Sequence, residues 1–390
     1  MKDIYIVEAV RTPVGKYKGG LAGVRADHLG AHLLNEIVRR AGIEAAEVDD
    51  VIFGCVTQVG EQSANIARTA LLGAGWPAAI PGLAIDRKCG SGEVAVHLAA
   101  GMIASGAAHV VVAGGAENMS RVRMGGNREV YGEAFGWMAS ENWELTSQGE
   151  AAERVADKFD LSRAQLDAYA VESHRRAAAA AQAGWFQREI AAVPVAALQE
   201  RGYGEPAPEV LAADETIRPG TNVEKLATLK TSFRENGKLS AGNSSQISDG
   251  AALLLLMSGE AVDRLQLEPR ARIRAFTTVG SDPTLMLTGP VAATRKVLAM
   301  SGLSVEDIDL FEVNEAFASV PLMWAKELGV SQERLNVNGG AIALGHPLGA
   351  SGARIMTSLL HELERRGARY GLQAICCAGG MGTATIIERI

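Results

Sequence analysis

The chain has 390 residues, of which 47% are hydrophobic and 21% charged, as expected of a globular protein large enough for two or more packed units. Its net charge of −7 argues against a nucleic-acid partner. The longest aliphatic run, Leu253 to Met257, is too short to cross a bilayer, so we expect no membrane association.

The number and spacing of the cysteines, together with the N-terminal residues, predict the redox state and the cellular compartment of the protein. Four cysteines without paired CxxC spacing argue against a disulfide framework and against a zinc site, so no metal is expected. The opening residues MKDIYIVEAV are typical of a first strand and not of a signal peptide. We therefore predict a cytoplasmic protein with reduced thiols.

The first 118 residues alternate short apolar strands with helical segments. Strands are predicted at Ile4 to Val7, Val51 to Phe53, Leu83 to Ile85 and Val110 to Val112, with a helix from Glu93 to Ser105. This alternation favours an α/β fold in which helices pack on a mostly parallel sheet.

Cys89 lies between one of these strands and the helix, in the glycine-dense segment from Asp86 to Gly92. The positive end of a helix dipole lowers the pKa of a nearby thiol, which favours a nucleophilic thiolate. The alternative is that Cys89 is a small buried apolar residue, as most free cysteines are.

Residues 119 to 248 differ in character from what precedes them. A long helical region is predicted from Glu150 to about Gln182, and its alanine-rich run, Ala177 to Ala181, is interpreted as surface helix. An irregular segment follows, and the chain then enters a buried strand from Ala251 to Met257. We expect this excursion to cover the substrate.

In the last third, Asn314 follows a strand from Leu310 to Val313 and precedes a helix. It is either an ordinary N-cap or a side-chain amide that holds an oxyanion or a water. His346 lies in an apolar segment, Asn338 to Gly352, with five glycines. A solvated loop histidine is the alternative to a buried, positioned imidazole, and the apolar surroundings favour the buried one.

A helix from Ala353 to Arg366 and a strand from Gln373 to Cys377 complete the chain. Adjacent residues of a strand point to opposite faces, so only one of Cys376 and Cys377 is expected to be reactive. A thiolate that attacks an acyl carbon, an imidazole that activates it and a second thiol that moves a proton together predict acyl transfer through a cysteine.

Several segments recur 260 residues apart. Gly42 matches Gly302, Val48 matches Ile308, and the Ser-Gly pair that opens a helix at Ser91 recurs at Ser351. The second helix–strand unit looks about five residues longer than the first. The repeat predicts two duplicated halves stacked into a layered α/β body.

The motifs around Cys89, Asn314, His346 and Cys376, in this order and spacing, resemble the signatures of the thiolase family, and the similarity runs from Arg11 to the C-terminus. The resemblance implies a five-layer αβαβα fold of two duplicated halves with an inserted loop domain. The implied division is residues 1–118 and 249–269 for the first half, 119–248 for the loop domain over the CoA site, and 270–390 for the second half.

The resemblance also implies coenzyme A thioester chemistry, with CoA as a substrate and no cofactor. Cys89 would carry the acyl group, His346 would activate Cys89, and Cys376 would move protons. One oxyanion site would use His346 and a water held by Asn314. The other would use the backbone N–H groups of Cys89 and Ala378.

The resemblance further implies a channel for CoA, lined by Arg218, Leu229, Ala241, Ser245, Met286 and Phe317. Three features depart from the family pattern. Ala378 stands where glycine is usual, Gln148 stands where the acetoacetyl-CoA-forming branch tends to have methionine, and the stretch from Glu117 to Gln148 is shorter than in that branch, where it helps to build tetramers. We therefore expect a homodimer, with a homotetramer as the alternative.

Two other functions stay open. A ketosynthase-like condensing enzyme would use carrier-protein substrates, but such sites typically lack a second cysteine, and Cys376 argues against it. A non-catalytic CoA- or lipid-binding relative would not need all four motifs. The residues leave open the acyl chain length and the direction in which the reaction runs.

Overall fold

The computed structural model describes residues 3–128, 132, 134–203 and 208–390. Parts of the predicted loop domain and of the stretch from Glu117 to Gln148, namely 129–131, 133 and 204–207, lie outside the described residues. No helix in the described ranges is both long and apolar enough to cross a membrane.

The first half of the chain builds a sheet in the order β4-β3-β5-β6-β1. Its strands are β1 (Ile4–Arg11), β3 (Asp50–Gly54), β4 (Gly82–Ile85), β5 (Val110–Asn118) and β6 (Ser248–Ser258). Strand β3 runs parallel to β4 and β5, whereas β6 is antiparallel to both β5 and β1. The sheet is thus more mixed than predicted, because the chain returns from the inserted segment to place β6 between β5 and β1.

The second half repeats this arrangement. Its strands are β7 (Ala271–Gly280), β8 (Leu310–Val313), β9 (Tyr370–Cys377) and β10 (Met381–Arg389), in the order β7-β10-β9-β8. The two sheets meet where β1 pairs with β7 through Tyr5 and Ile6, and the short β2 (Gly15–Lys16) pairs with β6.

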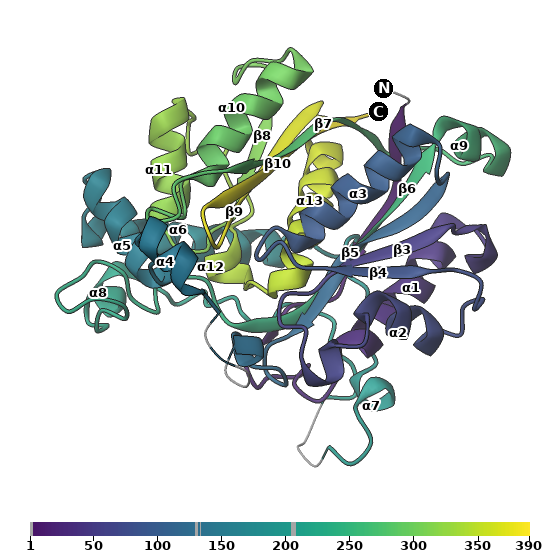
Figure 1. Ribbon diagram of the computed structural model, residues 1–390, viewed down its shortest axis with the longest axis horizontal. Coiled ribbons are helices and arrows are strands. Elements are labelled where there is room, and N and C mark those ends of the chain that lie inside the picture. The colour runs from purple at the N-terminus through teal and green to yellow at the C-terminus, as the bar shows by residue number, and fades with distance from the viewer. Residues whose placement is uncertain (1–2, 129–131, 133, 204–207) are drawn as a thin grey trace.

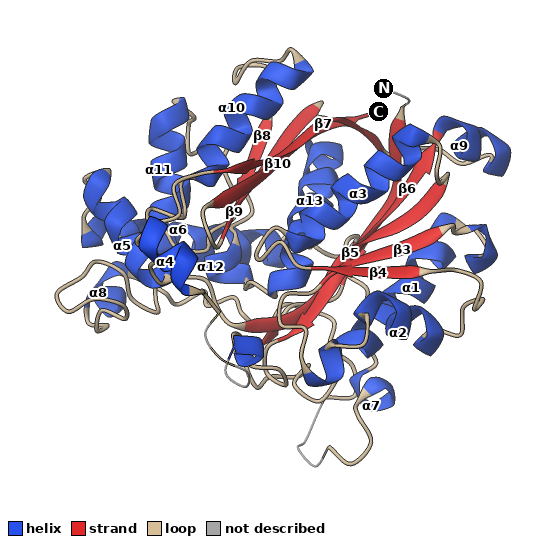
Figure 2. Cartoon of the chain, in the orientation of Figure 1, coloured by secondary structure: helices blue, strands red, loops and turns tan. Residues whose placement is uncertain are grey.

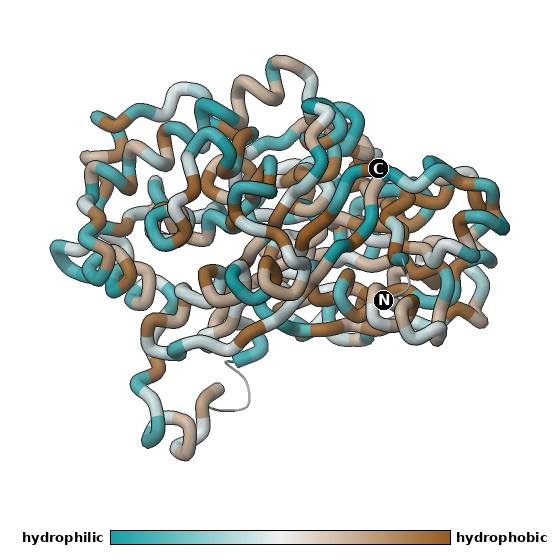
Figure 3. The backbone as a smooth tube through the Cα atoms, turned by 90° about the horizontal axis from the view of Figure 1, so that it is seen from above, coloured by the Kyte–Doolittle hydropathy of each residue, from teal (hydrophilic) through white to brown (hydrophobic). Residues whose placement is uncertain are grey.

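Helices form three layers around and between these sheets (Figures 1 and 2). Helices α1 (Ala26–Ala41) and α2 (Ile66–Gly73) cover one outer face, and α10 (Gly289–Ser301) and α11 (Ser319–Leu328) cover the other. Helices α3 (Ser91–Ser105) and α13 (Leu348–Arg366) pack together in the middle. The predicted five-layer αβαβα order is confirmed. Hydrophobic and hydrophilic stretches alternate along the chain in all parts of the molecule (Figure 3).

Matching hydrogen bonds show the duplication directly. The Asp49 carboxylate accepts the N–H groups of His109 and Val110 at 2.7 and 2.9 Å. The Asp309 carboxylate accepts those of Arg369 and Tyr370 at 2.8 Å each. Each residue of the second set lies 260 residues after its counterpart in the first set. Strand β9 likewise begins 260 residues after β5. The prediction that the second unit is five residues longer is therefore wrong. A glycine near the start of β9 interrupts its apolar pattern, so the predicted strand began too late.

The inserted segment holds two helices where one long helical region was predicted. Helix α5 (Gln148–Lys158) ends before Asp160, which adopts a left-handed φ of 53°. Helix α6 (Arg163–Gln182) begins with a capping box between Ser162 and Gln165.

The alanine-rich run of α6 is surface helix on one side only. Ala179 and Ala181 are exposed, whereas Ala177 and Ala180 are fully buried in a cluster with Ala343 and Leu344, which belong to the helix that precedes His346. The remaining short helices are α4 (Trp137–Asn142), α7 (Val195–Leu198), α8 (Val223–Ala227), α9 (Gly259–Leu265) and α12 (Ala341–Leu344), with 3-10 turns at Ala45–Glu47, Gly60–Gln62 and Gly126–Arg128.

Candidate active site

Cys89 lies in the turn that joins β4 to helix α3, and its side chain is 3% exposed. Lys88, just before it, has a left-handed φ of 52°. Gly90, just after it, has no room for a side chain, because a Cβ there would lie 2.6 Å from the sulfur of Cys377. The position of the Cys89 thiol is therefore set by close packing against strand β9.

Burial raises the pKa of Cys89 to about 12, and the nearby Asp86 and Glu117 carboxylates act in the same direction. This is opposite to the decrease expected from the helix dipole. Loss of hydration outweighs the dipole here, and Lys88 lowers the pKa less than burial raises it. The resting thiol is neutral and needs a base before it can attack a carbonyl carbon.

His346 is buried, and hydrogen bonds hold both its backbone and its side chain. The backbone N–H of His346 donates to the hydroxyl of Ser248 at 2.7 Å, and Nδ1 of the imidazole lies 2.6 Å from Oγ of Ser351. Since the Ser351 hydroxyl donates to the carbonyl of Pro347 at 2.8 Å, its oxygen must accept from Nδ1–H. This bond selects the tautomer in which Nε2 carries a lone pair.

His346 is also kept neutral. Burial, with a further contribution from the Arg354 cation, lowers the pKa of His346 to about 3. A neutral imidazole whose Nε2 carries a lone pair can accept a proton, which is the property that the Cys89 thiol requires.

Asn314 follows β8 directly, and α11 begins only at Ser319, so the N-cap interpretation is wrong. The Nδ2 of Asn314 lies 3.4 Å from Nε2 of His346. Its Oδ1 is buried and has no partner among the described residues. A buried orphan acceptor beside an imidazole fits a bound water or a polar group of a substrate.

The second thiol lies at the end of β9, where Cys376 pairs with Gly382 of β10. Burial raises the pKa of Cys376, and the next contribution comes from Cys89. Cys377 shows the same two contributions in the same order. Both thiols are therefore close to Cys89, although they occupy different apolar clusters: Cys376 is grouped with Ala378, and Cys377 with Cys89 itself.

The residues expected to line a CoA channel fall into two groups. Met286 and Phe317 are buried in the same cluster as Cys376, and the backbone N–H of Ser245 donates to the carbonyl of Ala316, in the loop between β8 and α11, at 3.0 Å. The others are exposed: Arg218, Leu229 and Ala241. Arg218 is the best anchored of the exposed ones, because its guanidinium donates to the Gln246 side chain at 3.0 Å.

Gln246 links this surface to the histidine loop. Its side-chain amide donates to the carbonyl of Ile342 at 2.8 Å, and its backbone carbonyl accepts the N–H of His346 at 3.1 Å. Gln148, the departure from the family pattern, is the first residue of α5 and is half-buried.

Sequence reasoning missed the groups that hold the site together. The buried Glu117 accepts the backbone N–H groups of Val56, Thr57 and Gly349 at 2.8, 2.9 and 2.9 Å, which ties the first half to the histidine loop. Ser248 and Ser351 were missed as well. Only the closeness of Ser351 to His346 in a glycine-rich segment could have suggested it.

Comparison with known proteins agrees with this geometry. Residues 4–260 match the family described as "Thiolase, N-terminal domain", and residues 267–389 match "Thiolase, C-terminal domain". A steroid 3-ketoacyl-CoA thiolase of Mycobacterium tuberculosis is 45% identical over 100% of this chain and 95% of its own. A 3-ketoacyl-CoA thiolase of Bacillus subtilis is 44% identical over the whole of both chains.

The fold is similar to a solved structure as well. The crystal structure of the Bacillus anthracis acetyl-CoA acetyltransferase superimposes with a TM-score of 0.90 at 39% identity, covering 100% of this chain and 99% of that one.

Proposed function

The chain belongs to the thiolase family, and from that premise we propose that it is an acyl-CoA C-acetyltransferase that works through an acyl group on Cys89. It would cleave 3-oxoacyl-CoA with CoA, or condense acetyl-CoA with an acyl-CoA. The observation that carries the proposal is a buried, neutral, tautomer-fixed His346, two residues before Leu348, which packs in one apolar cluster with Cys89 and Cys377.

In the condensing direction, the Cys89 thiol gives its proton to His346 and its sulfur attacks the acyl-CoA carbonyl. The C–S bond to CoA breaks, Cys376 protonates the departing thiolate, and the acyl group stays on Cys89. Cys376 then takes a proton from the α-carbon of acetyl-CoA. The resulting carbanion attacks the acyl carbonyl, the bond to Cys89 breaks, and His346 returns the proton. Thiolysis is the reverse.

Negative charge develops on a carbonyl oxygen in both stages. We assign one oxyanion site to Nε2 of His346 and a water held by Asn314, which is supported by the orphan Oδ1 of Asn314. The other uses the backbone N–H groups of Cys89 and Ala378. Each such donor is typically worth about 3 kcal/mol of barrier.

The test is turnover of acetoacetyl-CoA with CoA. Cys89→Ala should abolish turnover, whereas Cys377→Ala, which removes the neighbouring buried thiol on the opposite face of β9 from Cys376, should keep turnover within a fewfold. Wild-type turnover by the Cys89→Ala variant would exclude the mechanism.

We propose 3-oxoacyl-CoA esters as the substrate class, with CoA recognition through Arg218, Leu229, Ala241, Ser245, Met286 and Phe317. The relatives differ in the substrates that their names state, from acetyl-CoA to a steroid 3-ketoacyl-CoA. A panel of esters of rising acyl length measures the preference. A maximum at four carbons supports acetoacetyl-CoA, and a preference for longer chains supports a degradative role.

A homodimer is the proposed assembly. Strand β4 lies at the end of the sheet order, so one of its edges has no partner strand among the described residues. Leu83 on this strand is 43% exposed. An open apolar edge is a natural place for a second copy to pair. Light scattering at size exclusion should give twice the chain mass, and Leu83→Lys should lower it. A tetramer mass would favour the alternative.

Two further expectations remain proposals. The three-part division, 1–118 with 249–269, 119–248, and 270–390, is supported by the sheet order, since the inserted segment separates β5 from β6. A cytoplasmic location is supported by four unpaired thiols. Activity with free CoA thioesters would separate the proposed enzyme from a ketosynthase-like one. If the unmodified protein bound CoA but turned over no CoA thioester, it would be a non-catalytic relative.

A further inference from the structure

Gln246 is a half-buried residue, two positions before β6, whose side chain is hydrogen-bonded at both ends. Its Oε1 accepts from Nη2 of Arg218 at 3.0 Å. Its Nε2 donates to the carbonyls of Ile342 and Thr216 at 2.8 and 2.9 Å, and the carbonyl of Ala343 lies 3.3 Å from the same nitrogen. Because Nε2 faces carbonyl oxygens and Oε1 faces a guanidinium, only this orientation of the amide satisfies all its partners.

Helix α12 needs the donors that this amide supplies. The donors that would continue the helix for Ile342 and Ala343 belong to the residues four positions later, His346 and Pro347. The N–H of His346 is bonded elsewhere, and proline has none. Both carbonyls belong to fully buried residues, where a carbonyl without a partner costs free energy. The side chain of Gln246 therefore caps the helix that leads into the histidine.

The backbone of Gln246 follows the same loop. Its carbonyl accepts the N–H of His346 at 3.1 Å, and its N–H donates to the carbonyl of Ala341 at 3.5 Å. These two bonds do not depend on the side chain at this position. A substitution of Gln246 therefore tests the side-chain amide alone.

The other end of the amide holds Arg218 without neutralising it. Arg218 is exposed, its backbone N–H donates to Nδ1 of His174 at 3.1 Å, and its guanidinium donates to Gln246. The structure shows no ion pair for Arg218 among the residues it describes. A carboxylate at position 246 would bind the guanidinium and neutralise its charge, whereas an amide orients it and leaves the charge for a phosphate group of CoA.

We propose that Gln246 is a positioning residue that joins CoA recognition to the placement of the base. One amide caps the helix before His346 and orients the guanidinium of Arg218. The proposal rests on the proposed function, in which Arg218 contacts CoA and His346 accepts the proton of Cys89. Since a misplaced reacting group lowers the rate, CoA affinity and kcat both depend on Gln246, the first through Arg218 and the second through α12.

The experiment is a double-mutant cycle of Gln246→Met and Arg218→Ala in the full-length protein. Methionine keeps the length of glutamine and removes its acceptor and both donors. Isothermal titration calorimetry with CoA gives Kd, and initial rates of acetoacetyl-CoA thiolysis give kcat. Arg218→Ala should raise Kd about tenfold and keep kcat. Gln246→Met should raise Kd about threefold, because Arg218 loses its orientation, and should lower kcat about tenfold.

The double variant separates the two routes. Once Arg218 is gone, Gln246→Met should raise Kd no further, so the double variant should keep the Kd of Arg218→Ala. Independent effects would instead multiply to about thirtyfold. The loss of kcat should persist in the double variant, because the cap of α12 acts without Arg218. A merely structural loss would give neither the missing increase in Kd nor this split between Kd and kcat.

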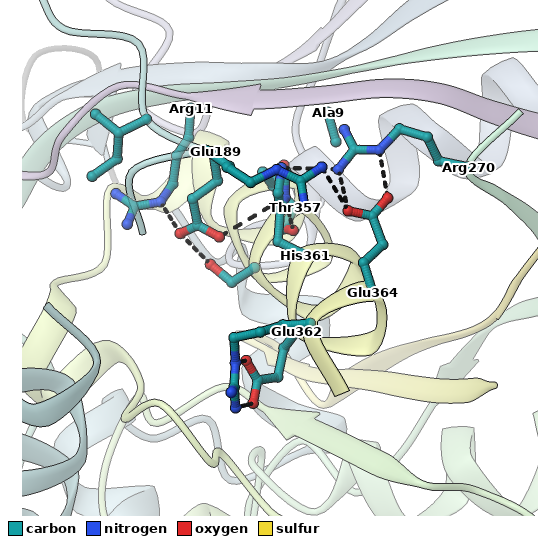
Figure 4. Close-up of polar contacts among 12 residues, drawn as sticks. Ala9, Arg11, Glu189, Arg270, Thr357, His361, Glu362 and Glu364 are labelled. Atoms are coloured by element: carbon teal, nitrogen blue, oxygen red, sulfur yellow. Dashed lines mark hydrogen bonds and ion pairs between the residues drawn. The ribbon is translucent and has the colours of Figure 1, made fainter. Parts of the chain in front are cut away.

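His361→Met is the matched control. Figure 4 shows His361 on α13 between Glu189 and Arg270. Its Nδ1 donates to the carbonyl of Thr357 and its Nε2 accepts from Arg270, both at 2.9 Å. His361 lies ten residues after Ser351, about 15 Å along the helix. The control should lower Tm through the loss of these two bonds and leave Kd and kcat unchanged.

A Kd of about thirty times the wild-type value in the double variant would overturn the proposal, as would a kcat of Gln246→Met within twofold of the wild type. If Met is not accepted, Gln246→Ala carries the same cycle, and loss of the fold in both variants would also overturn it. Calorimetry reads CoA binding without turnover. The cycle can therefore fail while Cys89→Ala still abolishes turnover, and the coupling in Kd can be found while the proposed mechanism fails.

Discussion

The hydrogen bond between Ser351 and His346 gives the most specific prediction. Ser351→Ala removes the oxygen that lies 2.6 Å from Nδ1, and the buried Nδ1–H then has no acceptor. An unsatisfied buried donor costs about 1–3 kcal/mol. The cost favours the other tautomer, in which Nε2 carries the proton and cannot act as a base.

Because about 1.4 kcal/mol corresponds to a factor of ten in rate, kcat for thiolysis of acetoacetyl-CoA should fall about 5- to 150-fold, with KM nearly unchanged. The assay is initial-rate kinetics with both substrates varied, together with thermal unfolding. Ser358→Ala is the matched control, since it removes a buried hydroxyl from the same helix that bonds to Glu189 and not to His346.

The control should lose stability but keep kcat. If Ser351→Ala kept kcat within twofold of the wild type at equal Tm, the tautomer argument would be refuted.

Three further predictions concern the neighbouring groups. Cys376→Ala should lose more than a hundredfold in turnover while still accepting an acyl group, whereas Cys377→Ala should keep turnover within a fewfold. If Cys377→Ala lost turnover and Cys376→Ala kept it, the proton transfer would belong to Cys377 and not to Cys376. Gly90→Ala should lower both kcat and Tm, because its Cβ would lie 2.6 Å from the sulfur of Cys377; a fully active variant would show that the turn is not tightly packed. Burial raises the pKa of Asp249 to about 6, so the folded state binds its proton more tightly and stability should fall as pH rises from about 4 to 6. Asp249→Asn should remove this decrease, which amounts to at most about 3 kcal/mol in the free energy of unfolding measured with urea. If the free energies of unfolding of the two proteins changed with pH in the same way, Asp249 would not be the group responsible.

Much of the architecture was accessible from local patterns. Strand β8 was predicted with its observed bounds, and the 260-residue repeat predicted the two stacked halves, because apolar runs and recurring motifs can be recognised in the sequence alone. The capping pair Ser162 and Gln165 also indicates the break between α5 and α6, but it was missed because the residues around it favour a helix.

The electrostatics of the site could not be predicted in the same way. The decrease expected for the pKa of Cys89 considered only its own helix. The increase comes instead from burial by residues such as Leu348 and Cys377, which lie more than 250 residues away in the chain. For the same reason, the bond between Ser248 and His346 and the bond from Gln246 to Ile342 appear only once the two halves are stacked.

The central claim is that Cys89 carries the acyl group, and trapping that group tests it most directly. The protein is incubated with acyl-CoA labelled in the acyl carbon, quenched in acid, digested and mapped by mass spectrometry. The account predicts a label on Cys89 in the wild type and in Cys376→Ala, and none in Cys89→Ala. A label on Cys376 or Cys377, or no covalent label while turnover proceeds, would contradict it.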